Sequence, residues 1–353
     1  MTARITGSGA ALPAPMDQQR LWDGFFKQHY NDARLAAKVW QHSGITTRRG
    51  VVDPTQEDIS TWGTGARMQR FLAEAMPLGK EAISGALADA GVDAADVGLL
   101  TVVSCTGYVT PGLDILLARD LGMTPAVQRL HIGHMGCYAA LPGLGATSDF
   151  VVARSRPAVM LCLELTSLHV QPTTETARSS SPTPEDLQQM VAHALFSDAA
   201  AAVVLEPGDG SGLSLVDVVA RTDVSTADHM TWDVTDTGFR MGLSPAVPDV
   251  LARHARPVVE ELLGRNGLAV QDVDGWAIHP GGRKIVDVVG EVLDLPEALL
   301  APSYDTLREV GNCSSATVLL VLDRVELQPG GTVVAMAFGP GLTLYAALLR
   351  RAA

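Results

Sequence analysis

The chain has 353 residues, of which 47 % are hydrophobic and 18 % charged, and its formal net charge at pH 7 is −13. This length predicts two packed halves, since it exceeds what one ordinary hydrophobic core supports. The acidic balance excludes a general affinity for nucleic acid or anionic membranes, so a local cluster of basic residues must bind any anionic substrate.

The chain carries no sign of a membrane span or a secretion signal. No apolar run approaches the roughly 18 residues that a span requires, and the N-terminal segment MTARITGSGAALPAP lacks the apolar region of a signal peptide. We therefore expect a cytoplasmic protein. The cysteines are scattered without a C-x-x-C pair, so neither a disulfide framework nor a zinc site is predicted. They are Cys105, Cys137, Cys162 and Cys313.

A local basic cluster lies in the segment 33–49, ARLAAKVWQHSGITTRR. Arg34 and Lys38 are four residues apart on a predicted helix, so their side chains share one face. Arg48 and Arg49 end the segment. A solvated surface face is the alternative interpretation for Arg34, Arg48 and Arg49.

Three pairs of similar segments, offset by about 175 residues, indicate an internal repeat. They are an amphipathic helix before a buried strand, a Gly-led helix before a strand, and a tight turn that leads into a strand. Their positions are 86–103 with 262–278, 136–162 with 311–337, and 194–206 with 337–349. The repeat predicts a duplicated α/β unit whose halves, 1–207 and 208–353, are related by a pseudo-twofold axis.

Cys137 lies in the segment 131–145, HIGHMGCYAALPGLG, between a Val-rich predicted strand and a run of small helix formers. A thiol at a helix start faces unpaired backbone N–H groups, which lower its pKa, and a nearby protonated His adds to this effect. The pattern predicts a reactive thiolate. The alternative for a lone cysteine is a buried structural residue. His131 and His134 have no further ligand at metal spacing and are interpreted as local polar contacts.

In the repeat, Cys137 corresponds to Asn312, and each directly follows a glycine at a predicted helix start. The pseudo-twofold axis brings these helix starts together between the halves, where ligand sites commonly form. His279 ends the buried strand of WAIHPGG (276–282), whose glycines let other backbone approach closely. Phe196 and the turn 338–341 complete the set, because glycines in that turn can present an N–H to an oxyanion. Alone, His279 and Phe196 would be interpreted as core residues.

Five motifs resemble, in order and nearly in spacing, those of the type III polyketide synthases, the chalcone synthase-like enzymes. They are GCYAALPG, ALFSDAAAAVV, WAIHPGGRKIVD, EVGNCSSATV and FGPGLT, and the likeness, to the bacterial type, covers essentially the whole chain. The resemblance implies an α/β, thiolase-like αβαβα layered fold made of two duplicated halves. It also implies a homodimer and a Cys-His-Asn site supplied with acyl-CoA.

The resemblance implies that Cys137 attacks a starter acyl-CoA and holds the acyl group covalently. His279 would keep the thiol ionised, and His279 and Asn312 would donate hydrogen bonds to the thioester oxygen of malonyl-CoA as CO₂ leaves. Phe196 would line the passage between the CoA tunnel and the cavity. The N–H groups of Cys137 and Gly341 would bind the tetrahedral intermediate. No metal or redox cofactor is implied, and CoA thioesters serve as substrates.

The CoA phosphates require basic residues. Lys38 falls where the family places a basic residue for these phosphates, and Arg34 shares its face. Arg283 and Lys284 directly follow HPGG, on the tunnel side of that motif.

Departures from the plant pattern concern the substrate. Cys105 and His169 stand where plant enzymes carry pocket threonines, and Pro245 is expected in place of a gatekeeper phenylalanine. By analogy with bacterial members, these changes favour an aliphatic starter and an alkylpyrone, resorcinol or similar product. The polar segment 171–189 is longer than in the plant pattern and is predicted to be a mobile surface loop.

Two other functions remain as alternatives. A ketoacyl synthase III-like condensing enzyme of fatty-acid synthesis shares the Cys-His-Asn set, but its His usually precedes Gln-Ala-Asn and not Pro-Gly-Gly. A non-catalytic binding protein of the same fold would be expected to have lost the nucleophile. The starter, the number of extensions and the cyclisation mode depend on cavity shape and stay open.

Overall fold

The computed structural model describes residues 2–179 and 181–353. Nine strands form one twisted sheet in the order β11-β12-β13-β8-β1-β7-β6-β4-β5. Two residue pairs between β1 and β8, Arg4 with Ser214 and Ile5 with Leu213, join its halves. The nine strands are β1 (Ala3–Ala11), β4 (Leu99–Val103), β5 (Gln128–Ile132), β6 (Ala158–Leu165), β7 (Asp198–Pro207), β8 (Leu213–Thr222), β11 (Gly275–Ile278), β12 (Thr332–Gly339) and β13 (Thr343–Arg351).

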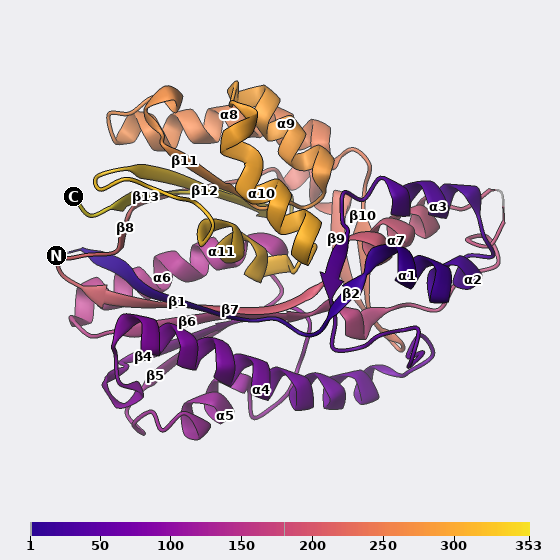
Figure 1. Ribbon diagram of the computed structural model, residues 1–353, viewed down its shortest axis with the longest axis horizontal. Coiled ribbons are helices and arrows are strands. Elements are labelled where there is room, and N and C mark those ends of the chain that lie inside the picture. Colours follow the sequence, from indigo (N-terminus) through magenta and orange to yellow (C-terminus); the bar gives the residue numbers. More distant parts are fainter. Residues whose placement is uncertain (1, 180) are drawn as a thin grey trace.

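Helices lie above, between and below the two half-sheets, which gives the predicted αβαβα layers (Figure 1). Helices α6 and α11 lie between the half-sheets, α8, α9 and α10 cover the C-terminal one, and α4 and α5 cover the N-terminal one (Figure 1). These helices are α4 (Thr64–Ala90), α5 (Leu113–Asp120), α6 (Ala140–Arg154), α8 (Val247–Arg265), α9 (Arg283–Leu293), α10 (Glu297–Val310) and α11 (Thr317–Leu322).

The central strands are buried on both faces, because helices cover them on each side. All eight residues of β6 and all eight of β12 are buried, which explains why both read as continuous apolar runs. The layers leave three hydrophobic cores, one between the half-sheets and one under each outer helix layer.

The predicted repeat is present in the structure. Helix α4, strand β4 and the parallel pair β4–β6 correspond to α8, β11 and the parallel pair β11–β12. Likewise α6 and β7 of the first half correspond to α11 and β13 of the second. Two single-turn 3-10 helices, η3 (Gly136–Tyr138) and η7 (Ser314–Ala316), precede α6 and α11 and contact each other between the halves.

A smaller unit projects from one end of the layers (Figure 1). It holds a hydrophobic core that includes Phe26, Trp40 and Met190. Its elements are β2 (Pro15–Asp17), α1 (Gln18–Leu21), α2 (Lys27–His29), α3 (Arg34–Gln41), β3 (Thr47–Arg49), α7 (Pro184–Leu195), β9 (Met230–Thr235) and β10 (Gly238–Leu243).

The segment predicted as a loop over 171–189 is partly helical. Pro184 begins α7, and the Thr183 side chain caps it by accepting the N–H of Asp186. The buried Asp186 carboxylate in turn accepts hydrogen bonds from Thr174 and Thr176. The prediction missed this capping pattern, and Ser180 lies outside the described residues. Within the described chain, no helix is both long and apolar enough to cross a membrane.

Candidate active site

Cys137 lies in η3, at the start of the central helix α6, as predicted. The preceding Gly136 has a φ of +76°, and a Cβ there would lie 2.5 Å from Cδ of Pro340. A Cβ on Gly339 would lie 3.3 Å from the backbone nitrogen of Cys137. Only glycines permit this approach, so the turn of the second half packs directly on the loop of the first half that carries Cys137.

Asn312 lies at the equivalent point of the second half, just before η7, and its side chain is held at both ends. Its Oδ1 accepts the N–H of Ser314 over 2.9 Å, and its Nδ2 donates to the backbone oxygen of Gly281 over 3.5 Å. Its backbone forms a parallel bridge with Phe196. The side chain is therefore oriented by the loop that follows His279.

His279 follows the last residue of β11, and its backbone N–H donates to the oxygen of Met336 over 2.8 Å. The buried ring meets Phe338 edge to face, with centroids 5.6 Å apart. Neither ring nitrogen has a hydrogen-bond partner among the described residues. A neutral imidazole without partners is free to accept a proton from a group that enters its cavity.

One cavity of about 350 Å³, the outer cavity, is lined by Cys137, His279 and Asn312 together. Phe196 and Lys284 also line it, and most of its remaining wall is apolar. The structure thus brings a thiol, an imidazole and a carboxamide from three separated motifs to one space. Such a set can transfer an acyl group and stabilise an oxyanion.

Two smaller cavities lie beyond Phe196. The inner cavity, about 120 Å³, is lined by Cys105, Cys137, Phe196, Trp232 and Met241 among others. The side cavity, about 50 Å³, shares Phe196, Trp232 and Met241 with it. Phe196 and Met241 line all three cavities, so these two side chains form the boundary between them.

The charge states of Cys137 and His279 differ from the prediction. Burial raises the pKa of the Cys137 thiol to about 12, although the Ser314 side chain and the N–H of Cys137 itself act to lower it. Burial also lowers the pKa of His279 to about 3. The expected depressed thiol pKa is thus not found, because the loss of water around the sulfur outweighs the helix start. Both groups are therefore neutral near pH 7.

The buried carboxyl group of Glu164 lies behind the inner cavity and escaped the sequence analysis. Its Oε2 accepts the N–H of Cys105 and the hydroxyl of Thr106, each over 2.9 Å, and its Oε1 accepts the hydroxyl of Ser315 over 2.6 Å. Burial raises its pKa to about 7. Glu164 therefore ties the inner cavity to the turn that follows Asn312.

The predicted pocket residues lie in three adjacent cavities. Cys105 lines the inner cavity, where its sulfur accepts the N–H of Gly136 over 3.1 Å. His169 lines the side cavity, stacked 4.5 Å from Phe239, and burial lowers its pKa to about 4. Pro245 lines only the outer one of these three cavities.

Met241 lies beside Phe196 at the boundary of all three cavities, and Pro245, which is predicted to replace a gatekeeper phenylalanine, lines the outer cavity. Met241 faces inward because it pairs with Trp232 in the β9–β10 ladder, whereas Pro245 follows the end of β10. The alternation of Met230, Trp232, Phe239 and Met241 around the turn Asp236-Thr237 was the sequence signal that could have found this wall.

The predicted CoA residues are only partly brought together. Lys284 lines the outer cavity. Arg283 stacks over Tyr304 at 5.6 Å, and its Cβ lies 3.4 Å from the Cβ position of Gly44, just beyond α3. Arg34 and Lys38 are exposed on α3 and do not line the outer cavity.

Other predicted residues take different places. Arg48 is buried, so its interpretation as a surface residue is wrong. Gly341 lines neither the outer nor the inner cavity. Among residues 2–179 and 181–353, no group of three or more His, Cys, Asp or Glu is placed to hold a metal ion, so His131 and His134 belong to no such group. All four cysteines are unpaired and buried.

Comparisons with known families agree with this geometry. The family described as chalcone and stilbene synthases, N-terminal domain, matches residues 2–209. Its counterpart, chalcone and stilbene synthases, C-terminal domain, matches residues 217–353.

Curated relatives are similar over most of their length. The alpha-pyrone synthesis polyketide synthase-like Pks18 of Mycobacterium tuberculosis is 34 % identical over 332 residues, which cover 87 % of this chain and 80 % of that protein. The 1,3,6,8-tetrahydroxynaphthalene synthase of Streptomyces peucetius is 35 % identical over 329 residues, covering 90 % and 84 %.

Solved structures superimpose on the whole chain. The 1,3,6,8-tetrahydroxynaphthalene synthase of Streptomyces coelicolor, a bacterial type III polyketide synthase, matches with a TM-score of 0.90 at 26 % identity, covering 99 % of both chains. PKS-I from the brown alga Ectocarpus siliculosus matches with a TM-score of 0.88 at 29 % identity, covering 99 % of this chain and 98 % of that one.

Proposed function

Because the chain belongs to the chalcone and stilbene synthase family, and is a type III polyketide synthase, we propose that Cys137, His279 and Asn312 carry out its condensations. Enzymes of this type are acyltransferases that use CoA thioesters. The observation that carries the assignment is the outer cavity, which these three side chains line together.

The first step is acyl transfer to Cys137. His279 takes the thiol proton as the sulfur attacks the starter thioester, and the CoA thiolate then leaves with a proton. The backbone N–H of Cys137 stabilises the tetrahedral oxyanion. Gly341, which lines neither cavity, is not retained as a second donor.

The second step is decarboxylation and condensation. The Nδ2 of Asn312 and the N–H of His279 donate to the thioester oxygen of malonyl-CoA, which stabilises the enolate as CO₂ leaves. The enolate carbon attacks the acyl thioester and releases Cys137. The extended chain returns to Cys137 for the next cycle and is finally cyclised.

The starter is proposed to be an aliphatic acyl-CoA and the product an alkylpyrone, resorcinol or similar compound. The support is the apolar wall of the inner cavity, in which Cys105, Trp232 and Met241 leave room for a narrow chain. One relative is named for alpha-pyrone synthesis. Lys284 at the outer cavity, with Arg283 and the α3 residues Lys38 and Arg34, is proposed to attract the CoA phosphates.

The reaction is proposed to need no metal or redox cofactor, since each step is acyl transfer or decarboxylation by the residues named above. A cytoplasmic location is proposed because the four cysteines are unpaired and the mechanism needs a free thiol, which reducing compartments maintain. The division into halves 1–207 and 208–353 is retained as a proposal.

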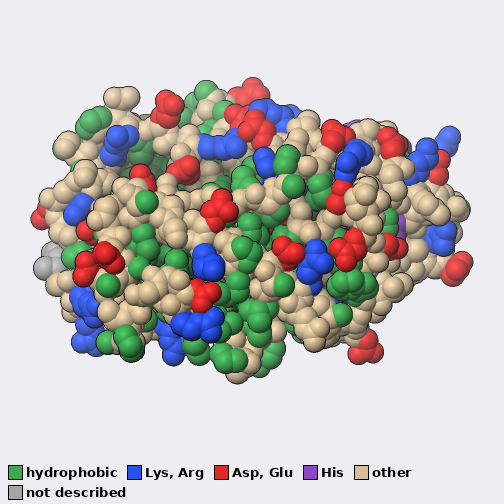
Figure 2. Space-filling model, turned by 60° about the horizontal axis from the view of Figure 1, so that its bottom comes forward, with side chains coloured by type: hydrophobic (Ala, Val, Ile, Leu, Met, Phe, Trp, Pro, Cys, Tyr) green, Lys and Arg blue, Asp and Glu red, His purple; other side chains and the backbone are tan. Residues whose placement is uncertain are grey.

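A homodimer is proposed through the edge strand β5. Four of its five residues are exposed, and it ends the sheet order. Hydrophobic side chains gather on the face of the molecule that Figure 2 brings forward. Exposed apolar residues include Leu130 in β5 and Ile115 in α5, the helix that contacts β5. An unpaired edge with apolar neighbours favours pairing with a second chain, which light scattering would test.

Mass spectrometry of products from malonyl-CoA and a panel of acyl-CoAs tests the proposed function. We expect pyrones or resorcinols from aliphatic starters and no product from the Cys137→Ala variant. Products from aromatic starters alone would contradict the proposed substrate class, and products from Cys137→Ala would contradict the nucleophile.

A further inference from the structure

Arg48 is only 6 % exposed, although arginine is rarely buried without a partner. Its Nη1 donates to the backbone oxygens of His193 over 2.5 Å and Phe196 over 3.2 Å. These carbonyl groups lie at the C-terminal end of α7, where they have no partner within the helix and where the helix dipole favours a cation. The guanidinium therefore fixes the backbone of the residue that borders all three cavities.

Two aromatic rings hold the guanidinium in place. Its Cζ lies 5.5 Å from the centroid of the Trp40 ring and 5.6 Å from that of Phe26. Trp40 belongs to α3, the helix that also carries Lys38. Arg48 thus lies where the proposed CoA-binding helix meets the end of α7.

The segment 195–197 lies between Arg48 on one side and Asn312 on the other. The hydroxyl of Ser197 accepts the N–H of Arg49 over 2.7 Å and donates to the oxygen of Val310 over 2.5 Å. The N–H of Ser197 donates to the oxygen of Asn312 over 2.9 Å.

The backbone segments around Gly311 are packed closely together. Gly311 has a φ of +86°, and a Cβ on it would lie 2.8 Å from Cβ of Ser197 and 3.3 Å from Cβ of Arg48. A shift of the Phe196 backbone would therefore shift Asn312.

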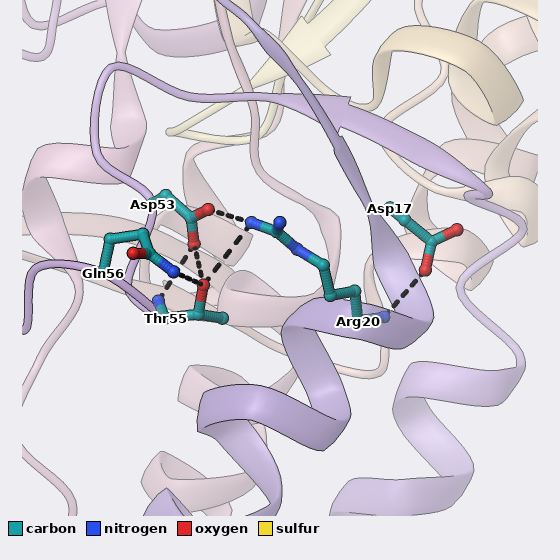
Figure 3. Close-up of polar contacts among 5 residues, drawn as sticks. All are labelled: Asp17, Arg20, Asp53, Thr55 and Gln56. Atoms are coloured by element: carbon teal, nitrogen blue, oxygen red, sulfur yellow. Dashed lines mark hydrogen bonds and ion pairs between the residues drawn. The ribbon is translucent and has the colours of Figure 1, made fainter.

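The backbone of Arg48 is anchored independently of α7. Strand β3 pairs with β2, whose last residue, Asp17, caps α1 by accepting the N–H of Arg20 over 2.7 Å. The Arg20 guanidinium in turn binds the carboxylate of Asp53, beyond β3 (Figure 3). Thr55 joins the same group, its hydroxyl donating to Asp53 over 2.7 Å (Figure 3). Arg48 therefore extends from a fixed strand.

We propose that Arg48 is a positioning residue, which holds Phe196 and, through their shared bridge, Asn312 in the geometry that malonyl-CoA decarboxylation requires. The proposal rests on the role proposed above for Asn312. The proposal predicts different effects on the two steps of the reaction, because Cys137 and His279 are attached to other elements. Loss of Arg48 should impair decarboxylation more than acylation.

The test compares Arg48→Met, which removes the charge at similar volume, with Arg48→Lys, which keeps a charge but loses the planar fork. Each protein is assayed for the rate of Cys137 acylation by intact mass, for CO₂ release from malonyl-CoA, and for Tm. Arg256→Met is the matched control, since Arg256 donates to the backbone oxygen of Val292 at the end of α9 and neither residue lines any of the three cavities.

We expect Arg48→Met to lower the rate of decarboxylation at least about tenfold relative to the rate of acylation. This is less than the effect of removing a whole oxyanion donor, because Asn312 is displaced but still present. For Arg48→Lys, the ratio of the decarboxylation rate to the acylation rate should lie between those of Arg48→Met and wild type. Arg256→Met should lower Tm without changing this ratio. Equal losses in both steps, or an unchanged ratio in folded Arg48 variants, would overturn the proposal.

If Arg48→Met does not fold, Ser197→Ala provides the test, because it removes the hydroxyl that links Arg49 to Val310 beside the Phe196–Asn312 bridge. It has to give the same selective loss, and an unchanged ratio would overturn the proposal. A wild-type protein that accepts no acyl group would overturn the proposed function, and this proposal with it. If the wild-type protein is acylated but the variants lose acylation and decarboxylation equally, this proposal alone is overturned.

Discussion

The indole Nε1 of Trp232 donates a hydrogen bond to the backbone oxygen of Cys105 over 3.0 Å. The bond joins the β9–β10 hairpin to the end of β4, two parts of the chain that are far apart in sequence. Trp232 lines both the inner and the side cavity, so the ring forms the wall between them. We expect this wall to limit the length of the acyl chain that is proposed to extend inward from Cys137.

Trp232→Leu should therefore favour longer starters. Removing the ring joins the two cavities, and each methylene that gains a buried place contributes about 0.8 kcal/mol, or about fourfold. The measurement is kcat/KM for lauroyl-CoA against hexanoyl-CoA in wild type and variant. An unchanged ratio in a variant with wild-type Tm would show that Trp232 does not limit chain length.

Cys105→Phe should act in the opposite direction. A ring in place of the thiol fills part of the inner cavity and excludes several carbons of a long tail, so preference moves to short starters. Overpacking costs about 1–3 kcal/mol, and Tm therefore has to be recorded with the same pair of kcat/KM values. A stable variant that keeps the wild-type ratio would remove Cys105 from the cavity wall.

The sequence sufficed for features that local patterns encode. The Gly-led helix starts at Cys137 and Asn312, and the strand end at His279, follow from periodicity and from the repeat, and the structure has all three. The layered fold followed because each half repeats the same helix and strand order.

Features that depend on packing between distant segments could not be predicted. The thiol pKa of Cys137 depends on how much water the second half excludes from it, which no local pattern reveals. Arg48 looked like a surface cation, since its partners, the carbonyls of His193 and Phe196, lie about 145 residues away in sequence. The place of Met241 at the cavity boundary could not be predicted either, because its inward direction depends on the register of the β9–β10 hairpin, which a match of motifs does not specify.

Cys137→Ala and Asn312→Ala should separate the two halves of the reaction. Cys137→Ala removes the acyl carrier but leaves His279 and Asn312, so polyketide formation stops while some decarboxylation of malonyl-CoA continues. Asn312→Ala still accepts the starter but should lose about 10²–10³-fold in decarboxylation, the usual effect of one oxyanion donor. CO₂ release and intact mass measure the two steps. Undiminished CO₂ release from Asn312→Ala would exclude that residue from the mechanism.

His279→Gln should slow alkylation of Cys137 most strongly near neutral pH. Burial, with the nearby Glu164 carboxylate as a lesser cause, raises the pKa of the thiol to about 12, so without an imidazole the thiolate forms only by loss of a proton to solvent. A general base accelerates a reaction by about 10²–10⁴-fold. The difference in alkylation rate between wild type and His279→Gln should narrow as pH rises, because the fraction of Cys137 present as thiolate grows. Peptide mapping after iodoacetamide, from pH 6 to 10, measures the rates.

The remaining cysteines serve as the control in that experiment. Burial raises the pKa values of Cys105, Cys162 and Cys313 as well. No imidazole is proposed as a base for any of them, although His134 lines the inner cavity with Cys105. Equal rates for Cys137 in both proteins at pH 7, or earlier labelling of another cysteine, would contradict the proposed pair.

Glu164→Gln should change how stability depends on pH. The pKa of Glu164 rises from 4.5 to about 7 on folding, so the folded state binds its proton more tightly than the unfolded state. Its contribution to stability is then fully present below pH 4.5 and is lost as pH rises towards 7. A shift from 4.5 to about 7 corresponds to about 3 kcal/mol.

Gln keeps an oxygen for the N–H of Cys105 and the hydroxyl of Thr106, and its NH₂ group can donate to the hydroxyl of Ser315, but it does not titrate. The free energy of unfolding of the variant, minus that of wild type, should therefore increase by about 3 kcal/mol between pH 4 and 8. Urea unfolding at steps of pH measures this difference. A difference that stays constant with pH would mean that Glu164 is already ionised in the folded protein, with its charge stabilised by the three hydrogen bonds that it accepts.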